Sequence, residues 1–447
     1  MRILYVLPEY GPGVRGGIAT YYAHLLPAIV KAGCQVDVCV ASESPPGVTV
    51  DRRDDGIRVT FIPPDKLRAA SEKVHHFAVS PGLRHSLAQA YVAWEACAGG
   101  SAYDVVETTD FAMMFVPWLA NGGGPPVVVQ LHGSSGQVDY YDPISGYELS
   151  GLLARLLEAA LLGRAEELQS YGAPNGREWS RLLGRHVEHI WPAWCPIETT
   201  ERAPPGLDLK RSGIAVGRIQ SWKGPEVLCR AVALLGDHAP NILWVGRDNP
   251  YRSPDRPMSA HLGRTYPAVW GEKVIPAGEH SREVVAAMQR AARFVVIPSN
   301  WDTFNLAAVE GMSAGKVVIC SDGAGAAELI EHGVNGFRFP AKDSRALADL
   351  IVRVDEMSDA EREAMGARGQ ATIADKLAVE TIAARRIDRY RTLKAQGTRR
   401  QQSLWGDSIF APTVVNSPFG FLNELPLKRI LRHAVWRMFN KSWEMLG

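Results

Sequence analysis

Short apolar runs rich in β-branched residues alternate with segments of helical periodicity along this chain, and the alternation occurs twice. This pattern is typical of parallel strands that are covered by helices on both faces. In the first series we expect a helix over 17–31 and strands at 3–7, 36–41, 105–107 and 127–131. In the second series we expect strands at 213–216, 242–245, 273–276, 294–297 and 317–320. The sequence therefore predicts an α/β protein with two doubly wound, Rossmann-like units.

Prolines separate the two units. Trp191–Pro196 and Pro204–Gly206 interrupt periodic structure, as linkers do. The domains that we expect are a first domain over 1–195, a linker over 196–212, a second domain over 213–393 whose last helix can cross back, and a basic tail over 394–447. Two such domains leave a cleft at the carboxyl ends of their strands, where ligands bind in open α/β folds.

The charge balance and the cysteines narrow the class of protein. The 49 Lys and Arg residues almost cancel the 48 Asp and Glu residues, so we expect no nucleic-acid partner. None of the six cysteines belongs to a C-x-x-C pair, which favours a reducing compartment and argues against zinc. No stretch approaches the ~20 apolar residues that span a bilayer. We therefore expect a cytoplasmic protein that is not integral to a membrane.

Two carboxylates eight residues apart flank the start of a predicted helix. Asp302 lies in the loop after a buried strand, and Glu310 lies inside the helix that follows. The free N–H groups near Phe304, Asn305 and Leu306 would bind a diphosphate. Glu310 would bind two ribose hydroxyls, and Asp302 would contact the transferred group. The structural alternative is that Asp302 complements the helix dipole and that Glu310 is a solvated surface residue.

Two cations lie five residues apart in the loop after the first strand of the second unit. Arg218 and Lys223 can both reach one diphosphate. A leaving group with two negative charges needs fixed cations, and such a pair serves where Mg²⁺ otherwise would. No Asp-x-Asp group follows a strand in the manner of metal-dependent transferases, so we expect no catalytic metal and no cofactor. The alternative is that both are ordinary surface cations.

The order of these motifs resembles glycosyltransferase family 4 over about residues 1–390, most closely from 213 to 340. The residues that carry the resemblance are Gly217-Arg218, Lys223-Gly224, Asp302 with seven residues to Glu310, Ser313–Val318 and Glu328–Phe337. The family comprises retaining, nucleotide-sugar-dependent enzymes of the GT-B fold. By resemblance, Arg218 and Lys223 hold the donor diphosphate and Glu310 holds the ribose. Asp302 stands where the family usually has a glutamate, so its reach is one methylene shorter.

The resemblance also assigns roles in the first unit. Backbone amides of Gly16 and Gly17 would approach the donor phosphates or sugar, and His132, at the end of the strand at 127–131, would lie beside the transferred sugar. A tight turn and a packed turn histidine are the structural alternatives. The glycines at 11, 13 and 16 also read as G-x-G-x-x-G, but Pro12 removes an amide and Asp37 falls inside the second strand. We therefore do not expect a dinucleotide site.

The tail contains one amphipathic segment. Apolar residues recur at helical spacing over 427–446, with basic residues mostly around or opposite them. This pattern fits peripheral contact with a membrane surface, at the inner face of the membrane for a cytoplasmic protein, and it fits equally a helix packed on the first domain. Both possibilities remain open from the sequence.

These observations predict a metal-independent, retaining glycosyltransferase. The donor would be a UDP or GDP sugar bound mainly by the second domain, and the acceptor would be a glycan, a lipid-linked molecule or a small molecule bound mainly by the first. The leaving phosphate oxygen would help to deprotonate the acceptor hydroxyl, so no dedicated base is expected. The alternatives are a sugar-nucleotide epimerase or phosphorylase on the same fold, or a non-catalytic nucleotide-sugar-binding subunit.

Overall fold

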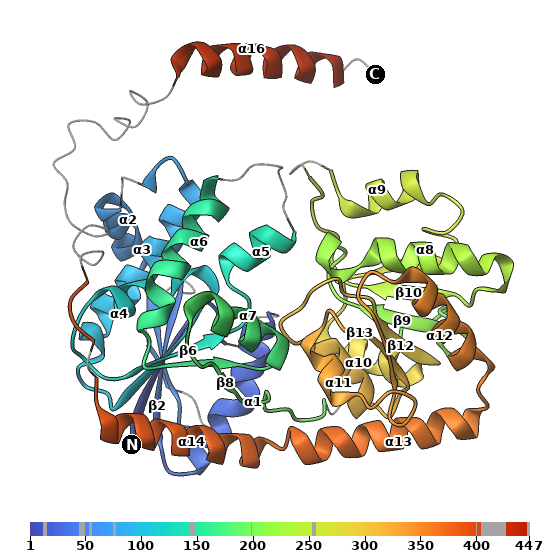
Figure 1. Ribbon diagram of the computed structural model, residues 1–447, viewed down its shortest axis with the longest axis horizontal. Helices are drawn as coiled ribbons and strands as arrows, with labels where there is room; N and C mark the ends of the chain where they lie inside the picture. The colour runs from blue at the N-terminus through green and yellow to red at the C-terminus, as the bar shows by residue number, and fades with distance from the viewer. Residues whose placement is uncertain are drawn as a thin grey trace.

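The computed structural model describes residues 1–11, 16–43, 50–52, 56–74, 77–142, 149–197, 199–252, 256–398, 400–403 and 426–444. These residues form two α/β domains side by side, with two long helices running along one side of both and a separate helix at the carboxyl end (Figure 1). The architecture is the predicted one, with a helical region after the second domain.

The first domain contains an eight-stranded sheet in the order β3-β4-β2-β1-β5-β6-β7-β8, parallel except for the pair β3 and β4. Its strands are β1 Arg2–Leu7, β2 Gln35–Glu43, β3 Val50–Arg52, β4 Arg58–Ile62, β5 Val105–Thr109, β6 Val127–Leu131, β7 Glu167–Ser170 and β8 Glu188–His189. Its helices are α1 Gly17–Lys31, α2 Pro64–Lys73, α3 Pro81–Ala96, α4 Val116–Ala120, α5 Ser135–Tyr141, α6 Leu149–Leu161 and α7 Ala173–Leu183. Buried side chains pack on both faces of this sheet, as the apolar runs predict.

The second domain contains a six-stranded parallel sheet in the order β11-β10-β9-β12-β13-β14. Its strands are β9 Gly213–Val216, β10 Ile242–Val245, β11 Val274–Gly278, β12 Phe294–Ile297, β13 Val318–Ser321 and β14 Phe337–Phe339. Its helices are α8 Pro225–Leu235, α9 Met258–Thr265, α10 Arg282–Ala291, α11 Leu306–Ser313 and α12 Ser344–Glu356. Strands β9 and β12 are neighbours, so the loops that follow them emerge side by side.

Two helices after the second sheet connect the domains. Helix α13 (Asp359–Lys376) runs along the second domain and α14 (Val379–Gln396) along the first (Figure 1). At their junction, the Trp194 amide donates to the Leu377 carbonyl at 3.0 Å, so the chain's two crossings between the domains pair side by side.

A buried ion pair fixes α14 on the first domain. Arg386 on α14 donates to Glu107 on β5 at 2.5 Å, and both side chains have no exposed area. Tyr22 donates to the other oxygen of Glu107 at 2.7 Å, while Arg386 also donates to Tyr21 and Gln130 at 2.8 and 2.9 Å. Because several hydrogen bonds satisfy both charges, the pair can be buried without an unmatched charge.

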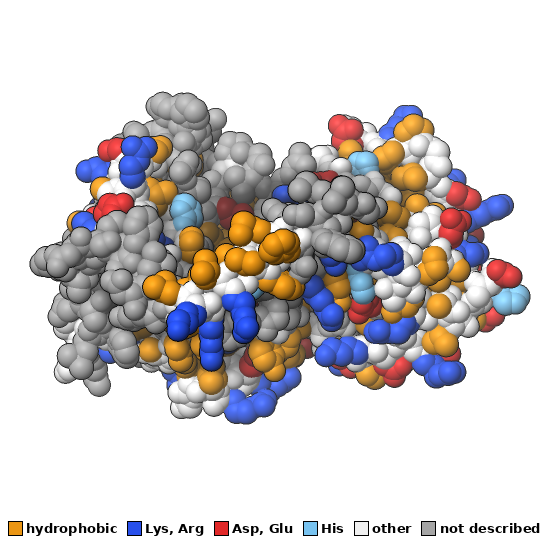
Figure 2. All heavy atoms as spheres, turned by 90° about the horizontal axis from the view of Figure 1, so that it is seen from above, with side chains coloured by type: hydrophobic (Ala, Val, Ile, Leu, Met, Phe, Trp, Pro, Cys, Tyr) orange, Lys and Arg blue, Asp and Glu red, His pale blue; other side chains and the backbone are white. Residues whose placement is uncertain are grey.

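The last described helix, α16 (Leu427–Glu444), exposes its apolar side chains (Figure 2). Leu427, Leu431, Met438 and Phe439 are 64 to 68% exposed. The described part of the chain therefore does not cover the apolar stripe, contrary to the alternative in which it packs on the first domain. Among the described residues, no helix is both long and apolar enough to cross a bilayer.

Candidate active site

The carboxyl ends of strands from both sheets meet between the domains. The Thr303 hydroxyl, in the loop after β12, donates to the His132 carbonyl after β6 at 3.0 Å. The Ala173 amide, after β7, donates to Glu328 of the second domain at 2.8 Å. The loops that carry the predicted site residues therefore face one another across this boundary, where open α/β folds bind ligands.

Lys223 and Asp302 are in direct contact. The Lys223 Nζ lies 2.5 Å from Asp302 Oδ2, and the two side chains are 19% and 11% exposed. Asn305 donates to the same oxygen at 3.0 Å and to Ser299 Oγ at 3.3 Å. The side chains of Lys223, Asp302 and Asn305 thus form one preorganised cluster at the amino end of α11.

Backbone geometry around this cluster requires particular residues. Gly224 has a φ of +76°, and a Cβ at this position would lie 1.8 Å from the Pro298 carbonyl oxygen. The close approach holds the Lys223 loop against the end of β12. Asn305 has a φ of +81°, and its side chain accepts from the Ala308 amide as the N-cap of α11. Asparagine tolerates this left-handed conformation better than most residues do.

Arg218 lies at the same boundary with an exposed side chain. Its positive charge interacts electrostatically with two acidic side chains of the first domain, Glu9 and Asp142. Burial raises the pKa of Asp142, while a hydrogen bond from the Ser221 backbone and the charge of Arg218 oppose that rise. The guanidinium is therefore placed where it can meet an anion that enters between the domains.

The amino end of α1 is closed by Glu9. The Ala19 amide donates to Glu9 Oε1 at 3.4 Å, and a Cβ on Gly16 would lie 1.5 Å from that same oxygen. A side chain at position 16 would therefore require the Glu9 carboxyl group to shift, and Gly17 is exposed beside it. Burial raises the pKa of Glu9. A donor phosphate at Gly16 and Gly17 would have to displace the Glu9 carboxyl group, a competition that the sequence did not predict.

His132 emerges at the end of β6 as expected, inside an aromatic cluster. Its ring packs edge-on against Tyr21 and Tyr171, with the Tyr171 hydroxyl 3.3 Å from Nδ1. Burial lowers the pKa of His132 to about 3, with the charge of Arg386 acting in the same direction. The imidazole is therefore neutral near pH 7, and it can exchange a hydrogen bond with a sugar without carrying charge.

The loop of His132 is held by a residue that sequence reasoning missed. Buried Asp110, which follows β5, accepts from the His132 amide at 2.8 Å and from the Gly133 amide at 3.3 Å. Burial raises the pKa of Asp110 to about 7. A polar residue directly after the buried strand Val105–Thr109 was the available signal.

Glu310 lies near the domain crossing and not in the Lys223 cluster. It lines a cavity of about 190 Å³ together with Trp194, Ser313 and other residues of α10, α11 and the linker. Burial raises the pKa of Glu310 to about 7, and the charge of Arg282 opposes the rise. The carboxyl group is thus poised between its protonated and ionised forms near neutral pH.

The remaining residues predicted to bind the donor, Phe304, Asn305 and Leu306, have different structural roles. Helix α11 begins at Leu306, so Phe304 and Asn305 precede its first turn. The buried ring of Phe304 packs near Tyr171 and Trp191, so only its backbone is available to a ligand in this arrangement. Asn305 serves as N-cap and orients Asp302. Leu306 is partly buried against the core.

A ladder of three rings spans the boundary beside the cluster. Tyr141 of α5 stacks on Trp301 with centroids 4.3 Å apart, and Trp301 stacks on Trp222 at 5.1 Å. Trp222 and Trp301 immediately precede Lys223 and Asp302 in the sequence. The ladder therefore positions both charged loops relative to the first domain.

No metal cluster accompanies these groups in the described ranges. The described His, Cys, Asp and Glu residues nowhere form a group of three that could hold a metal ion. The expectation of no catalytic metal stays a prediction.

Two family models match the two domains. Residues 16–170 match the model described as "Glycosyl transferase 4-like domain", and residues 210–356 match the one described as "Glycosyl transferases group 1". The two matches fall on the two sheets in turn, and they include every predicted site residue.

Curated relatives are similar over most of the chain. A D-inositol 3-phosphate glycosyltransferase of Xylanimonas cellulosilytica is 25% identical over 420 residues, which cover 88% of this chain and 95% of that protein. A glycogen synthase of Mycobacterium tuberculosis is 26% identical over 396 residues, which cover 83% and 90%.

Solved structures share the fold. Sucrose-phosphate synthase of Thermosynechococcus elongatus has a TM-score of 0.68 at 22% identity, covering 89% of this chain and 100% of that one. Anabaena HepE in complex with UDP-glucose has a TM-score of 0.60 at 18% identity, covering 88% and 100%.

Proposed function

This chain belongs to the GT4-type glycosyltransferases of the GT-B fold, and we propose that it transfers a sugar from a UDP-sugar to an acceptor hydroxyl with retention at the anomeric carbon. The donor would lie on the second domain and the acceptor on the first. The observation that carries the proposal is the contact of Lys223 with Asp302 at the amino end of α11. There a cation, helix N–H groups and a carboxylate lie close together, and this combination suits the binding of a diphosphate with its attached sugar.

In this proposal the cluster works on the leaving group. Lys223 and Arg218 stabilise the negative charge that grows on the diphosphate as the sugar departs. Asp302, which neutralises Lys223 before the donor arrives, turns toward the sugar once the diphosphate takes its place. Neutral His132 contributes a hydrogen bond to the sugar from the first domain. The leaving phosphate oxygen accepts the proton of the attacking hydroxyl, so no other base is assigned.

The choice of UDP as the donor nucleotide rests on solved structures of proteins with the same fold. Anabaena HepE binds UDP and UDP-glucose in its solved structures, whereas nothing in these comparisons supports the GDP sugar also expected from the sequence. The relatives and neighbours named above are a D-inositol 3-phosphate glycosyltransferase, a glycogen synthase and a sucrose-phosphate synthase. We therefore propose a polar, polyhydroxylated acceptor. The epimerase, phosphorylase and binding-subunit alternatives are not favoured.

We propose a cytoplasmic location for this enzyme. All six cysteines are free, and Cys39, Cys229 and Cys320 are buried as thiols, which suits a reducing compartment. Peripheral contact with a membrane is a separate proposal that concerns the tail.

A ligand panel tests the donor. In thermal-shift measurements with UDP, GDP, ADP and their glucose conjugates, the uridine compounds are expected to raise the melting temperature most. A ligand at 100 times its dissociation constant adds ~2.7 kcal/mol to the stability. Sugar transfer should persist in EDTA, because the Arg218 and Lys223 cations serve the diphosphate. Conversion of the donor without any acceptor would indicate an epimerase, and strict dependence on Mg²⁺ would contradict the metal-free site.

Glu310 predicts a pH dependence of donor binding. The ribose hydroxyls need an ionised acceptor, and the pKa of Glu310 is raised to about 7. UDP affinity should therefore fall as the pH drops below about 7, by up to ~10-fold per pH unit. Glu310→Gln should weaken UDP binding by ~10-fold or more. The UDP affinity of this variant should also change little with pH on either side of pH 7. Calorimetric titration measures both effects, and exposed Glu272→Gln is the control; an unchanged profile in Glu310→Gln would remove Glu310 from the donor site.

A further inference from the structure

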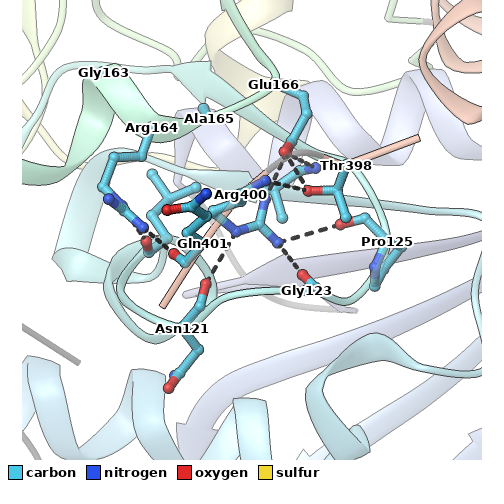
Figure 3. Close-up of polar contacts among 12 residues, drawn as sticks. Asn121, Gly123, Pro125, Gly163, Arg164, Ala165, Glu166, Thr398, Arg400 and Gln401 are labelled. Carbon is cyan, nitrogen blue, oxygen red and sulfur yellow. Dashed lines mark hydrogen bonds and ion pairs between the residues drawn. The ribbon is translucent and has the colours of Figure 1, made fainter. Parts of the chain in front are cut away.

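After α14, the chain returns to the first domain and binds there through a short segment. This clasp segment (residues 397, 398 and 400–403) lies along the loop 121–125 and the turn before β7 (Figure 3). Arg400, only 4% exposed, lies 2.5 Å from Glu166 and donates to the carbonyls of Asn121, Gly123 and Pro125. The Thr398 hydroxyl donates to the other oxygen of Glu166 at 2.6 Å.

Backbone hydrogen bonds complete the clasp segment. The Gly123 amide donates to the Arg400 carbonyl at 2.9 Å, and the Ser403 amide donates to the Ala120 carbonyl at 3.0 Å. Arg164 adds a bond to the Gln401 carbonyl. The start of the tail is therefore fixed on the first domain, and α16 follows after residues 404–425. Even fully extended, these 22 residues reach at most ~80 Å, so α16 stays tethered to this domain.

Helix α16 presents two kinds of side chain to its surroundings. Leu427, Ile430, Leu431, Val435 and Met438 recur at spacings of three and four, so they share a face, and each is at least 38% exposed. Phe439, 68% exposed, extends the apolar area at its edge, whereas Trp436, 58% exposed, lies four residues after Arg432 and therefore on the basic side of the helix. Figure 2 shows apolar side chains gathered along one side of the helix and basic side chains along the other. An apolar area of this kind, left open by the described part of the chain, marks an interaction surface.

The net charge of α16 indicates what kind of partner its apolar face binds. Lys428, Arg429, Arg432, Arg437 and Lys441 oppose a single acid, Glu444. Two copies of such a helix would bring like charges together, whereas an anionic lipid surface attracts the basic side chains and accepts the apolar ones. We propose that α16 docks the enzyme on anionic membranes. Because the clasp segment is on the first domain, that domain then stays within ~80 Å of the lipid surface; this would suit a lipid-linked acceptor, a consequence that rests on the proposed function.

Flotation of the full chain with vesicles tests the docking independently of transfer activity. The protein should float with vesicles of equal parts phosphatidylcholine and phosphatidylglycerol, but not with phosphatidylcholine alone. Added salt should weaken the binding, because exposed charges are screened. Failure of the intact chain to float with the anionic vesicles would overturn the proposal.

Paired variants locate the contact. Leu427→Glu with Leu431→Glu should reduce flotation by ~10-fold or more, since both leucines would otherwise enter the lipid. The control is Leu182→Glu with Leu234→Glu, which changes leucines that are 62% and 54% exposed on the two α/β domains. Equal flotation of the two double variants would overturn the assignment to α16. A different pair of results would identify a second copy of the chain as the partner. In that case neither the parent nor the variants would float, and only the variant in α16 would have a smaller mass in solution than the parent.

Discussion

Replacing Lys223 by methionine is expected to slow sugar transfer by ~10²-fold or more while the protein stays folded. The ammonium lies 2.5 Å from Asp302 at the amino end of α11, and methionine keeps much of the side-chain volume without the charge. The departing diphosphate then loses a fixed cation where its negative charge develops. Steady-state kinetics of transfer from the preferred UDP-sugar measure the effect, with Lys273→Met as a control outside the cluster.

The partners of Lys223 sharpen this test. Arg218→Ala should also slow transfer, and the double variant should be slower by less than the product of the single effects, because both cations serve one leaving group. Asp302→Glu restores the length that the family usually has at this position, and it tests whether the shorter carboxylate suits this enzyme's sugar. Full activity of Lys223→Met would refute the role of the cluster.

Arg386→Met is expected to lower the free energy of unfolding by ~3–5 kcal/mol, because it leaves Glu107 as an unpaired charge with no exposed area. The adjacent variant Arg385→Met is the matched control. Arg385 is 48% exposed and pairs with Glu188 at the surface, so its loss should cost at most ~1 kcal/mol. Denaturant titration followed by tryptophan fluorescence compares the two.

The double variant Glu107→Leu with Arg386→Met should recover part of the lost stability, since it removes both buried charges together. Recovery would be incomplete because Tyr22 and Tyr21 lose hydrogen-bond partners. Equal stability of Arg386→Met and Arg385→Met would show that the buried pair does not fix α14.

Sequence periodicity predicted the buried strands well. The expected strands at 127–131, 213–216, 242–245 and 294–297 coincide with β6, β9, β10 and β12. It missed β7, whose residues Glu167–Ser170 are mostly polar yet buried. Arg389, more than two hundred residues later in the chain, supplies the partner that allows Glu167 to be buried there. Apolar patterns cannot report a strand whose burial depends on so distant a charge.

The candidate site was predictable to the extent that it depends on loops after strands. Arg218, Lys223 and Asp302 were expected at one cleft, and the adjacency of β9 and β12 brings Lys223 to Asp302 across 79 residues. The position of Glu9 against Gly16 was not predictable, because it depends on how one loop folds back on the next helix. Asp110, a polar residue directly after a buried strand, was also missed, because its partners are the backbone amides of His132 and Gly133 and no side-chain motif marks them.

The paired crossings at Trp194 and Leu377 restrict how the domains can move. Two adjacent covalent connections permit bending about the line between them, but they resist twisting of one domain over the other. Opening and closing would then follow a single axis. Each closure would bring the Thr303 hydroxyl back to the His132 carbonyl. The relative position of donor and acceptor would then be set by the geometry of this axis and would be the same in each catalytic cycle.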